Sequence, residues 1–230
     1  MRATLKHPIS LSSDQQILVG WILLAVFAVW QFNGIYLSAM GQGSALFFWI
    51  LDGFQWIVLP VALIALLAHQ GALYPEHYGL ASPGKNLWPL ALQGLLIFVI
   101  AGLVFIVVRN LSWRVLGPSP GNFQLAQFFP QGVAGTALQL YAAVSAGLVE
   151  SIFFIGLPWL WYANARSKPS KLHFMLIASA IFALAHWEHG RHIMIAAFCL
   201  HLVLCKYFFQ WNTLWPVVLG HTLIGLAIMV

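Results

Sequence analysis

Long apolar runs alternate with short polar connections along the whole chain. Each run holds about 20 residues with few or no charges, the length that an α-helix needs to cross the hydrocarbon core of a bilayer. The connections carry the prolines and glycines typical of turns. The pattern predicts an all-α, polytopic transmembrane helix bundle of about seven spans, in a single membrane domain that covers residues 1–230. The predicted spans are 17–37, 45–68, 87–108, 135–162, 172–187, 193–209 and 214–230.

The composition excludes an ordinary soluble domain. Hydrophobic residues make up 61% of the chain and charged residues only 7%, whereas soluble domains carry about 25% charged residues. The net charge of +5 comes from basic residues spread over short loops, without a cluster that resembles a nucleic-acid site. We therefore expect the lipid bilayer as a partner and no nucleic acid.

The basic residues predict an orientation. They favour the cytoplasmic side of membrane proteins, and the predicted topology separates them seven to three when the N-terminus is inside. This places the N-terminus in the cytoplasm and the C-terminus outside, and we expect an integral protein of a bacterial inner membrane. The inner set is Arg2, Lys6, Lys85, Arg166, Lys168, Lys171 and Lys206, and the outer set is Arg109, Arg114 and Arg191.

One carboxylate interrupts the fourth predicted span. Glu150 is the only acidic or basic residue between Arg114 and Arg166. A charged group at the centre of a membrane helix costs at least ~2.5 kcal/mol, so it usually faces the bundle interior and has a function. The alternative is a carboxyl group that only ties two helices together through hydrogen bonds.

Two histidines in apolar surroundings strengthen the functional interpretation. His186 lies near the end of the fifth predicted span and His221 lies on the seventh. A single intramembrane histidine is more often a packing or hydrogen-bonding residue. An acid and two imidazoles on three spans, with almost no other charge in the helices, favour acid–base chemistry.

These residues lie in the segments GLVESIFFIG, FALAH and GHTLIG. The segments resemble the three motifs of the CPBP family of intramembrane proteases, which includes the CAAX prenyl endopeptidases and bacterial Abi proteins. The family patterns are Glu-Glu-x-x-x-Arg, Phe-x-x-x-His and His-x-x-x-Asn/Asp, and their order and separations match here. The similarity covers residues 130 to 230, with the motif-bearing catalytic core at 134–230 and a weaker echo at His77-Tyr78-Gly79-Leu80.

Three positions depart from the family pattern. Ser151 replaces the second glutamate and Ile155 replaces the arginine, so both members of an i, i+4 pair are neutral together. Gly225 stands where the family has Asn or Asp, which removes a side-chain donor near the developing oxyanion. Loss of one such donor typically costs about 100- to 1000-fold in rate.

The resemblance implies a metal-independent glutamic endopeptidase that cleaves a membrane-anchored protein or peptide, without a cofactor. Glu150, beside His186, would orient and deprotonate the attacking water, while His221 would donate to the oxyanion. The supporting candidates are His201, as a replacement for the missing Asn, Gln139, on the same helix face as Glu150, and Ser151.

A metal site is a weaker alternative. Zinc can be held by histidine and carboxylate ligands with an open position, and Glu188, His189 and His192 offer such groups. However, there is no His-Glu-x-x-His segment, and these three residues are expected where a loop meets water. Aspartyl chemistry is also disfavoured, because Asp52 has no second intramembrane aspartate as a partner.

Two further function classes stay open. A non-catalytic scaffold or immunity protein on the same fold is consistent with Ser151, Ile155 and Gly225. A small proton-coupled transporter would use Glu150 and the histidines as a relay. Clustering of these groups in one cavity would favour the protease, and dispersal along a path through the membrane would favour the transporter.

Overall fold

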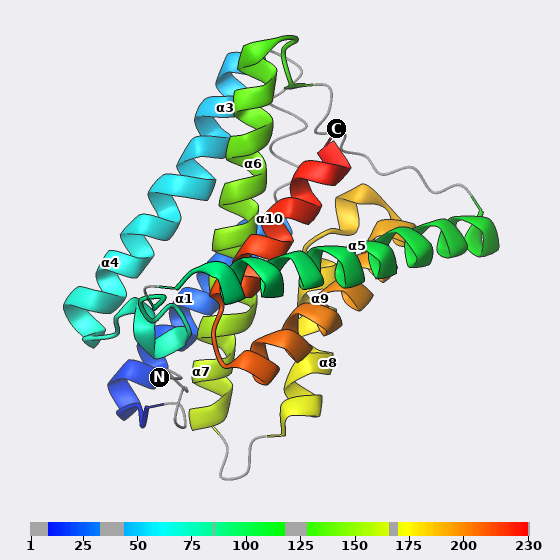
Figure 1. Ribbon diagram of the computed structural model, residues 1–230. Helices are drawn as coiled ribbons and strands as arrows, with labels where there is room; N and C mark the ends of the chain where they lie inside the picture. Colours follow the sequence, from blue (N-terminus) through cyan, green and yellow to red (C-terminus); the bar gives the residue numbers. More distant parts are fainter. Residues whose placement is uncertain (1–8, 33–43, 85, 118–127, 166–169, 230) are drawn as a thin grey trace.

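The computed structural model describes residues 9–32, 44–84, 86–117, 128–165 and 170–229, and every regular element in these ranges is helical (Figure 1). The predicted all-α bundle is confirmed. The α-helices are α1 Ser13–Gln31, α3 Ala45–Gly53, α4 Leu59–Gly71, α5 Trp88–Leu116, α6 Val133–Ser151, α7 Leu157–Asn164, α8 Lys171–Leu184, α9 Arg191–Trp211 and α10 Trp215–Met229. Two π-helical segments, η1 Phe54–Val58 and η4 Ile152–Gly156, and two 3₁₀ turns, η2 Pro75–Tyr78 and η5 Trp187–His189, complete the described elements.

Seven apolar helical segments correspond to the seven predicted spans. Five are long and apolar enough to cross a membrane, and α8 and α10 are shorter apolar helices. The protein is therefore an integral, multi-pass membrane protein. The five long segments are Ser13–Gln31, Ala45–Gly71, Trp88–Leu116, Val133–Asn164 and Arg191–Trp211.

The predicted start of the first span and the predicted end of the third are wrong, and the predicted end of the first span at 37 lies outside the described residues. The first helix begins at Ser13 rather than at residue 17, because Ser12 forms a capping box with Gln15 that starts the helix within the polar segment. The third helix continues to Leu116, past the predicted end at 108. Arg109 and Arg114 do not stop it, since long basic side chains can carry their charge away from an apolar helix surface.

Both π-helical segments have the same sequence cause. Each one ends immediately before a Leu-Pro pair, Leu59-Pro60 or Leu157-Pro158. Proline lacks the N–H that closes an α-helical turn, and its ring collides with the carbonyl four residues earlier, so the preceding turn widens. The second segment follows Glu150 by one residue and carries Phe154 into the cavity wall.

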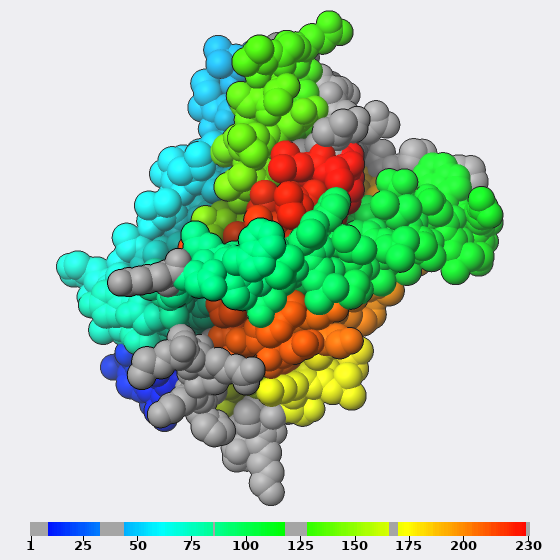
Figure 2. Space-filling model, viewed as in Figure 1, coloured from blue at the N-terminus to red at the C-terminus, as the bar shows by residue number. Residues whose placement is uncertain are grey.

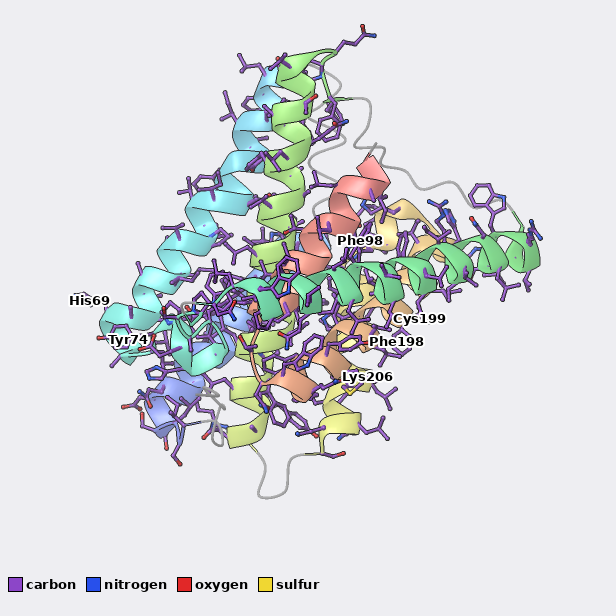
Figure 3. The ribbon with its side chains drawn as sticks, in the orientation of Figure 1. His69, Tyr74, Phe98, Phe198, Cys199 and Lys206 are labelled. Carbon is purple, nitrogen blue, oxygen red and sulfur yellow. The ribbon has the colours of Figure 1, made fainter. Side chains whose placement is uncertain are left out.

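The outer surface of the bundle is apolar. Large hydrophobic side chains on α1, α3, α4 and α5 are exposed, including Trp21 at 66% and Leu103 at 60%. Figure 3 shows side chains around the whole circumference of the helices, including the exposed His69 on α4. Such a surface is unfavourable in water and is expected where lipid tails form the solvent.

Helix α10 is held close to α5 and α6 by glycines. A side chain at Gly94 of α5 would collide with Leu219, and one at Gly147 of α6 would collide with Thr222. The helices can therefore approach closely, as small residues allow in membrane bundles. Figure 2 shows α5 lying over α9 and α10. This packing brings His221, between Leu219 and Thr222, beside Glu150.

The start of α10 is fixed by the turn that follows η2. The Leu214 N–H donates to the Gly79 carbonyl over 2.8 Å, and the Trp215 indole donates to the Ala81 carbonyl over 2.7 Å. Gly156 lies against the Tyr78 carbonyl, where any side chain would collide. The segment His77-Tyr78-Gly79-Leu80 therefore has a structural role, because it locks α10 against the end of η4.

Candidate active site

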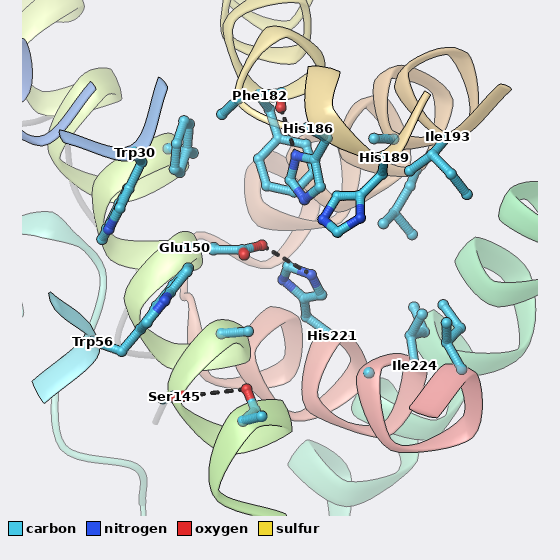
Figure 4. A pocket seen from close by; sticks show the side chains of 18 of the residues that line it. Trp30, Trp56, Ser145, Glu150, Phe182, His186, His189, Ile193, His221 and Ile224 are labelled. Carbon is cyan, nitrogen blue, oxygen red and sulfur yellow. Dashed lines mark hydrogen bonds and ion pairs between the residues drawn. The ribbon is translucent and has the colours of Figure 1, made fainter. Parts of the chain in front are cut away.

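A cavity of about 520 Å³ opens between α1, α3, α6 and α10 and the turn after α8. Its lining residues come mainly from the ends of α1, α3 and α8, the second halves of α6 and α10, and the first half of α9. Figure 4 shows Glu150, His186, His189 and His221 pointing into this one space. Three segments that are far apart in the sequence thus supply an acid and three imidazoles to a shared cavity.

Glu150 and His221 are in direct contact. The Glu150 Oε2 atom lies 3.3 Å from the His221 Nε2 atom, and the two residues are each 8% exposed. Glu150 lies at the end of α6, and the close α6–α10 contact at Gly147 sets its separation from His221. An ionised carboxylate only accepts hydrogen bonds. The contact with Glu150 Oε2 therefore favours a proton on His221 Nε2.

The His186 ring is oriented by its own chain. Its Nδ1 atom lies 2.8 Å from the Phe182 carbonyl, and a carbonyl only accepts, so Nδ1 carries a proton. In the neutral ring Nε2 is then an acceptor. The ring also packs against Phe182, with centroids 4.5 Å apart. His186 can therefore accept a hydrogen bond from a water molecule held near Glu150.

The three positions that depart from the family pattern hold uncharged residues that pack against their neighbours. Ser151 is buried and donates its hydroxyl to the Gly147 carbonyl over 2.6 Å. Ile155 is fully buried in the apolar core. Gly225 lines the cavity, and a Cβ there would lie 3.3 Å from the Cβ of Ala143. Glycine at 225 thus accommodates a close approach of α10 to α6.

The structure does not bring the other supporting candidates into the cavity wall. His201 stacks on Phe182, at 4.5 Å between centroids, and its Nδ1 atom lies 3.1 Å from the Ser179 hydroxyl. Phe182 lines the cavity, whereas His201 is not among the lining residues. Gln139 is half-buried on α6, and the residues that line the cavity do not include it.

Two residues in and after the connection that follows α8 are buried, whereas the sequence predicts that they are exposed to water. Glu188 and His192 are only 3% and 8% exposed. The Trp187 indole donates to the Gln31 carbonyl over 2.6 Å, which draws the η5 turn against the end of α1. Burial raises the pKa of Glu188 to about 7. No group of three His, Cys, Asp or Glu side chains with the geometry to hold a metal ion is found within the described ranges.

Asp52 is a second acid in the cavity wall whose surroundings the sequence did not reveal. It is 7% exposed on α3, lines the cavity and accepts a hydrogen bond from the Tyr141 hydroxyl over 2.9 Å. The same wall contains Trp30 and Trp56, whose stacked rings lie 4.9 Å apart. The sequence feature that could have indicated this wall is Asp52 itself, an acid within an apolar run and four residues before Trp56.

The fold and this site define a polytopic helical membrane protein with a buried carboxylate and imidazole centre. Residues 132–227 match the family model described as type II CAAX prenyl endopeptidase Rce1-like. The resemblance predicted from the three motifs is therefore confirmed, and over this region the chain is similar to a family of membrane endopeptidases. No curated protein and no solved structure matches the chain.

Proposed function

We propose that the protein is a glutamic intramembrane endopeptidase that hydrolyses a peptide bond of a membrane-anchored protein or peptide. The observation that carries this proposal is the 3.3 Å contact between Glu150 and His221 in a cavity that His186 also lines. A carboxylate shielded from bulk water is a stronger base than an exposed one, which suits the activation of a water molecule.

The reaction needs only the groups in this cavity. Glu150 takes a proton from water while the water oxygen forms a bond to the carbonyl carbon, and the carbonyl oxygen becomes an oxyanion. The Nε2 atom of His186 accepts the second hydrogen of the water and so orients its attack. When the C–N bond breaks, Glu150 returns its proton to the leaving amine, and a carboxylic acid and an amine are released.

His221 can donate a hydrogen bond to the negative charge both before and after the attack of the water. Before the attack its Nε2–H faces the negative charge of Glu150. Protonation of Glu150 transfers that charge to the substrate oxyanion, which then becomes the better acceptor. A donor aimed at charge that develops in the transition state lowers the barrier more than one aimed at the ground state. Because Gly225 provides no second donor, we expect a slow enzyme.

The grouping of the acid and the imidazoles disfavours a proton-coupled transporter. Glu150, His186 and His221 line one cavity, whereas a relay would distribute them through the membrane. A non-catalytic scaffold differs from the protease only in its chemistry, so an assay must separate these two functions.

The orientation of the site follows from the proposed topology. We infer that the N-terminus is cytoplasmic, in a bacterial inner membrane. The cavity lies at the opposite end of α1 from the start of that helix, so it would open toward the outer face. A reporter fused after Val230 that is active only outside the cytoplasm tests this orientation, and activity of a cytoplasmic reporter at the same point would contradict it.

The catalytic proposal is tested with the purified full-length protein in detergent micelles. The protein is incubated with a library of lipid-anchored peptides, and products are identified by mass spectrometry. We expect the Glu150→Gln variant to lose cleavage at least about 1000-fold, because the carboxylate is the only proposed base. The matched Glu76→Gln variant changes an exposed acid in the η2 turn and should cleave like the wild type. Equal cleavage by Glu150→Gln and wild type would contradict the proposal, and no cleavage by either would favour the scaffold.

A further inference from the structure

The cavity concentrates the acidic residues of a basic protein. The chain has five acidic residues and ten lysines and arginines. Three of the five acids, Asp52, Glu150 and Glu188, line the cavity, and among the residues that the structure describes no lysine or arginine lines it. The proposed hydrolysis uses Glu150 alone, so two carboxyl groups in the wall have no part in that reaction.

The wall that contains Asp52 is also aromatic. Trp30 stacks on Trp56 and on Phe154, with centroid distances of 4.9 Å and 5.6 Å. Trp56 follows Asp52 by four residues, and both line the cavity. A carboxylate beside an indole ring is a favourable environment for an ammonium or guanidinium group, which is attracted by both.

The wall has polar atoms that the described part of the chain leaves without partners. The Trp30 indole N–H is buried without an acceptor, and Glu188 Oε2 is buried without a donor. Trp30 and Glu188 are each 3% exposed and line the cavity. A buried polar group without a partner is unfavourable, and a peptide segment offers both kinds of partner, a carbonyl for the indole and an N–H or a cation for the carboxyl group.

We propose that Asp52 and Trp56 form a subsite for a lysine or arginine side chain of the substrate, next to the site of hydrolysis. This inference rests on the proposed endopeptidase function. It adds a substrate class, a peptide with a basic residue close to the cleaved bond. Asp52 binds the cation, the Tyr141 hydroxyl orients the Asp52 carboxylate through its 2.9 Å hydrogen bond, and Trp56 offers its ring to the same cation.

Binding to an inactive enzyme separates this inference from the hydrolysis. The probes are palmitoylated 16-residue peptides that are identical except for one central residue, which is lysine, arginine, norleucine or glutamate. Their dissociation constants are measured by thermophoresis with the full-length Glu150→Gln protein in uncharged maltoside micelles. We expect the lysine and arginine peptides to bind at least about tenfold more tightly than the norleucine peptide, because an ionic hydrogen bond and a cation–π contact are both gained.

Variants in the same background locate the subsite. Asp52→Asn should reduce the preference for lysine over norleucine to less than about threefold. Trp56→Leu should weaken lysine binding about threefold or more. Tyr141→Phe should reduce the preference less than Asp52→Asn does, because the carboxylate remains but loses the hydroxyl that orients it. The matched control Asp14→Asn changes an exposed acid at the start of α1 and should have no effect. Glu188→Gln should retain most of the preference.

Each result bears on one of the two proposals. Absence of binding, equal binding of all four peptides, or an unchanged preference in Asp52→Asn would overturn the subsite. If Asp52→Asn does not fold, an unchanged lysine affinity in Trp56→Leu overturns it instead. Tight, Asp52-dependent binding of a peptide that the wild type does not cleave would support the subsite and contradict the endopeptidase function.

Discussion

The two parts of the chain contribute differently to the cavity. In the most apolar stretches of Ser13–Gln31, Ala45–Gly71 and Trp88–Leu116, 22% of the residues are buried, against 61% in Val133–Asn164 and 50% in Arg191–Trp211. The well-buried C-terminal part contains the region that matches the endopeptidase family. It supplies Glu150, His186 and His221, whereas the N-terminal part supplies the wall with Trp30, Asp52 and Trp56.

This difference has a physical consequence. Side chains that react must keep fixed positions, and close packing on all sides fixes them. Helices that expose one face to lipid and the other to the cavity have fewer neighbours to hold them. We therefore expect substitutions in the C-terminal part to affect the chemical step and the fold, and substitutions in the N-terminal wall to affect substrate binding.

After the loss expected for Glu150→Gln, the largest effect is expected at His221. His221→Gln removes the imidazole that faces Glu150 and should lower kcat by about 100- to 1000-fold, because the oxyanion loses its donor. The measurement is steady-state cleavage of the peptide that the wild type cleaves fastest in the library. His69→Gln, an exposed position on α4 (Figure 3), is the control and should leave kcat unchanged. A His221→Gln variant with wild-type kcat would exclude the role proposed for this residue.

Two glycine substitutions test the difference in packing. Gly147→Ala places a methyl group against the backbone and side chain of Thr222 on α10 and should destabilise the fold by about 1–3 kcal/mol. Gly53→Ala, on α3, meets no atom within 4 Å and should have little effect on stability. Thermal unfolding of both variants in the same detergent checks this prediction. A larger loss in Gly53→Ala would reverse the order proposed for the two parts.

Much of the fold and of the reacting centre could be predicted from the sequence. Apolar length alone predicts the helices, and the rarity of charge in them singles out Glu150, His186 and His221. The contact between Glu150 and His221 depends on how closely α6 and α10 approach. Gly147 and Gly225 permit that approach, but neither glycine indicates which helix it will meet.

The wall of the cavity could not be predicted in the same way. Glu188 follows a histidine and a tryptophan in a polar connection, which is typical of an exposed loop. It is buried because Trp187 binds the end of α1, more than 150 residues earlier in the chain. Similarly, Asp52 has its hydrogen-bond partner, Tyr141, on another helix. Such contacts depend on the tertiary arrangement, and local periodicity contains no information about them.

A gain of activity is expected at Gly225. Gly225→Asn restores a side-chain donor at the position where the family has one, and should raise kcat about tenfold. This is less than the full value of an oxyanion donor, because Ala143 lies 3.3 Å from the new Cβ and must shift by a few tenths of an ångström. Gly225→Ala introduces the same crowding without the donor and should not raise kcat. An equal kcat in both variants would show that the missing donor does not limit the reaction.

A smaller and different effect is expected in the N-terminal wall. Trp56→Leu should raise the KM of a peptide with a basic residue by about threefold or more, with kcat within twofold of the wild type, because cation–π contacts contribute about 0.5–2 kcal/mol. The comparison peptide, with norleucine at the basic position, should show no change in KM. A fall in kcat with unchanged KM would place Trp56 with the reacting groups and remove the distinction between the two parts.

The smallest effect concerns stability and pH at Glu188, which belongs to the C-terminal part but has no role in the proposed reaction. Its folded-state pKa is raised to about 7 by burial, from 4.5, so the folded protein holds this proton more tightly than the unfolded chain does. The stability that Glu188 contributes is therefore complete below about pH 4.5 and is lost as the pH rises through about 7.

Glu188→Gln cannot ionise, so its melting temperature relative to the wild type should rise between pH 5 and pH 8. Each kcal/mol of this difference corresponds to about 2–4 °C. The His189 Nε2 atom is 4.0 Å from Glu188 Oε1, so His189→Gln is measured in parallel. If Glu188→Gln and the wild type lose stability equally as the pH rises, the buried carboxyl group is not the source of the loss, and another residue must supply the titration.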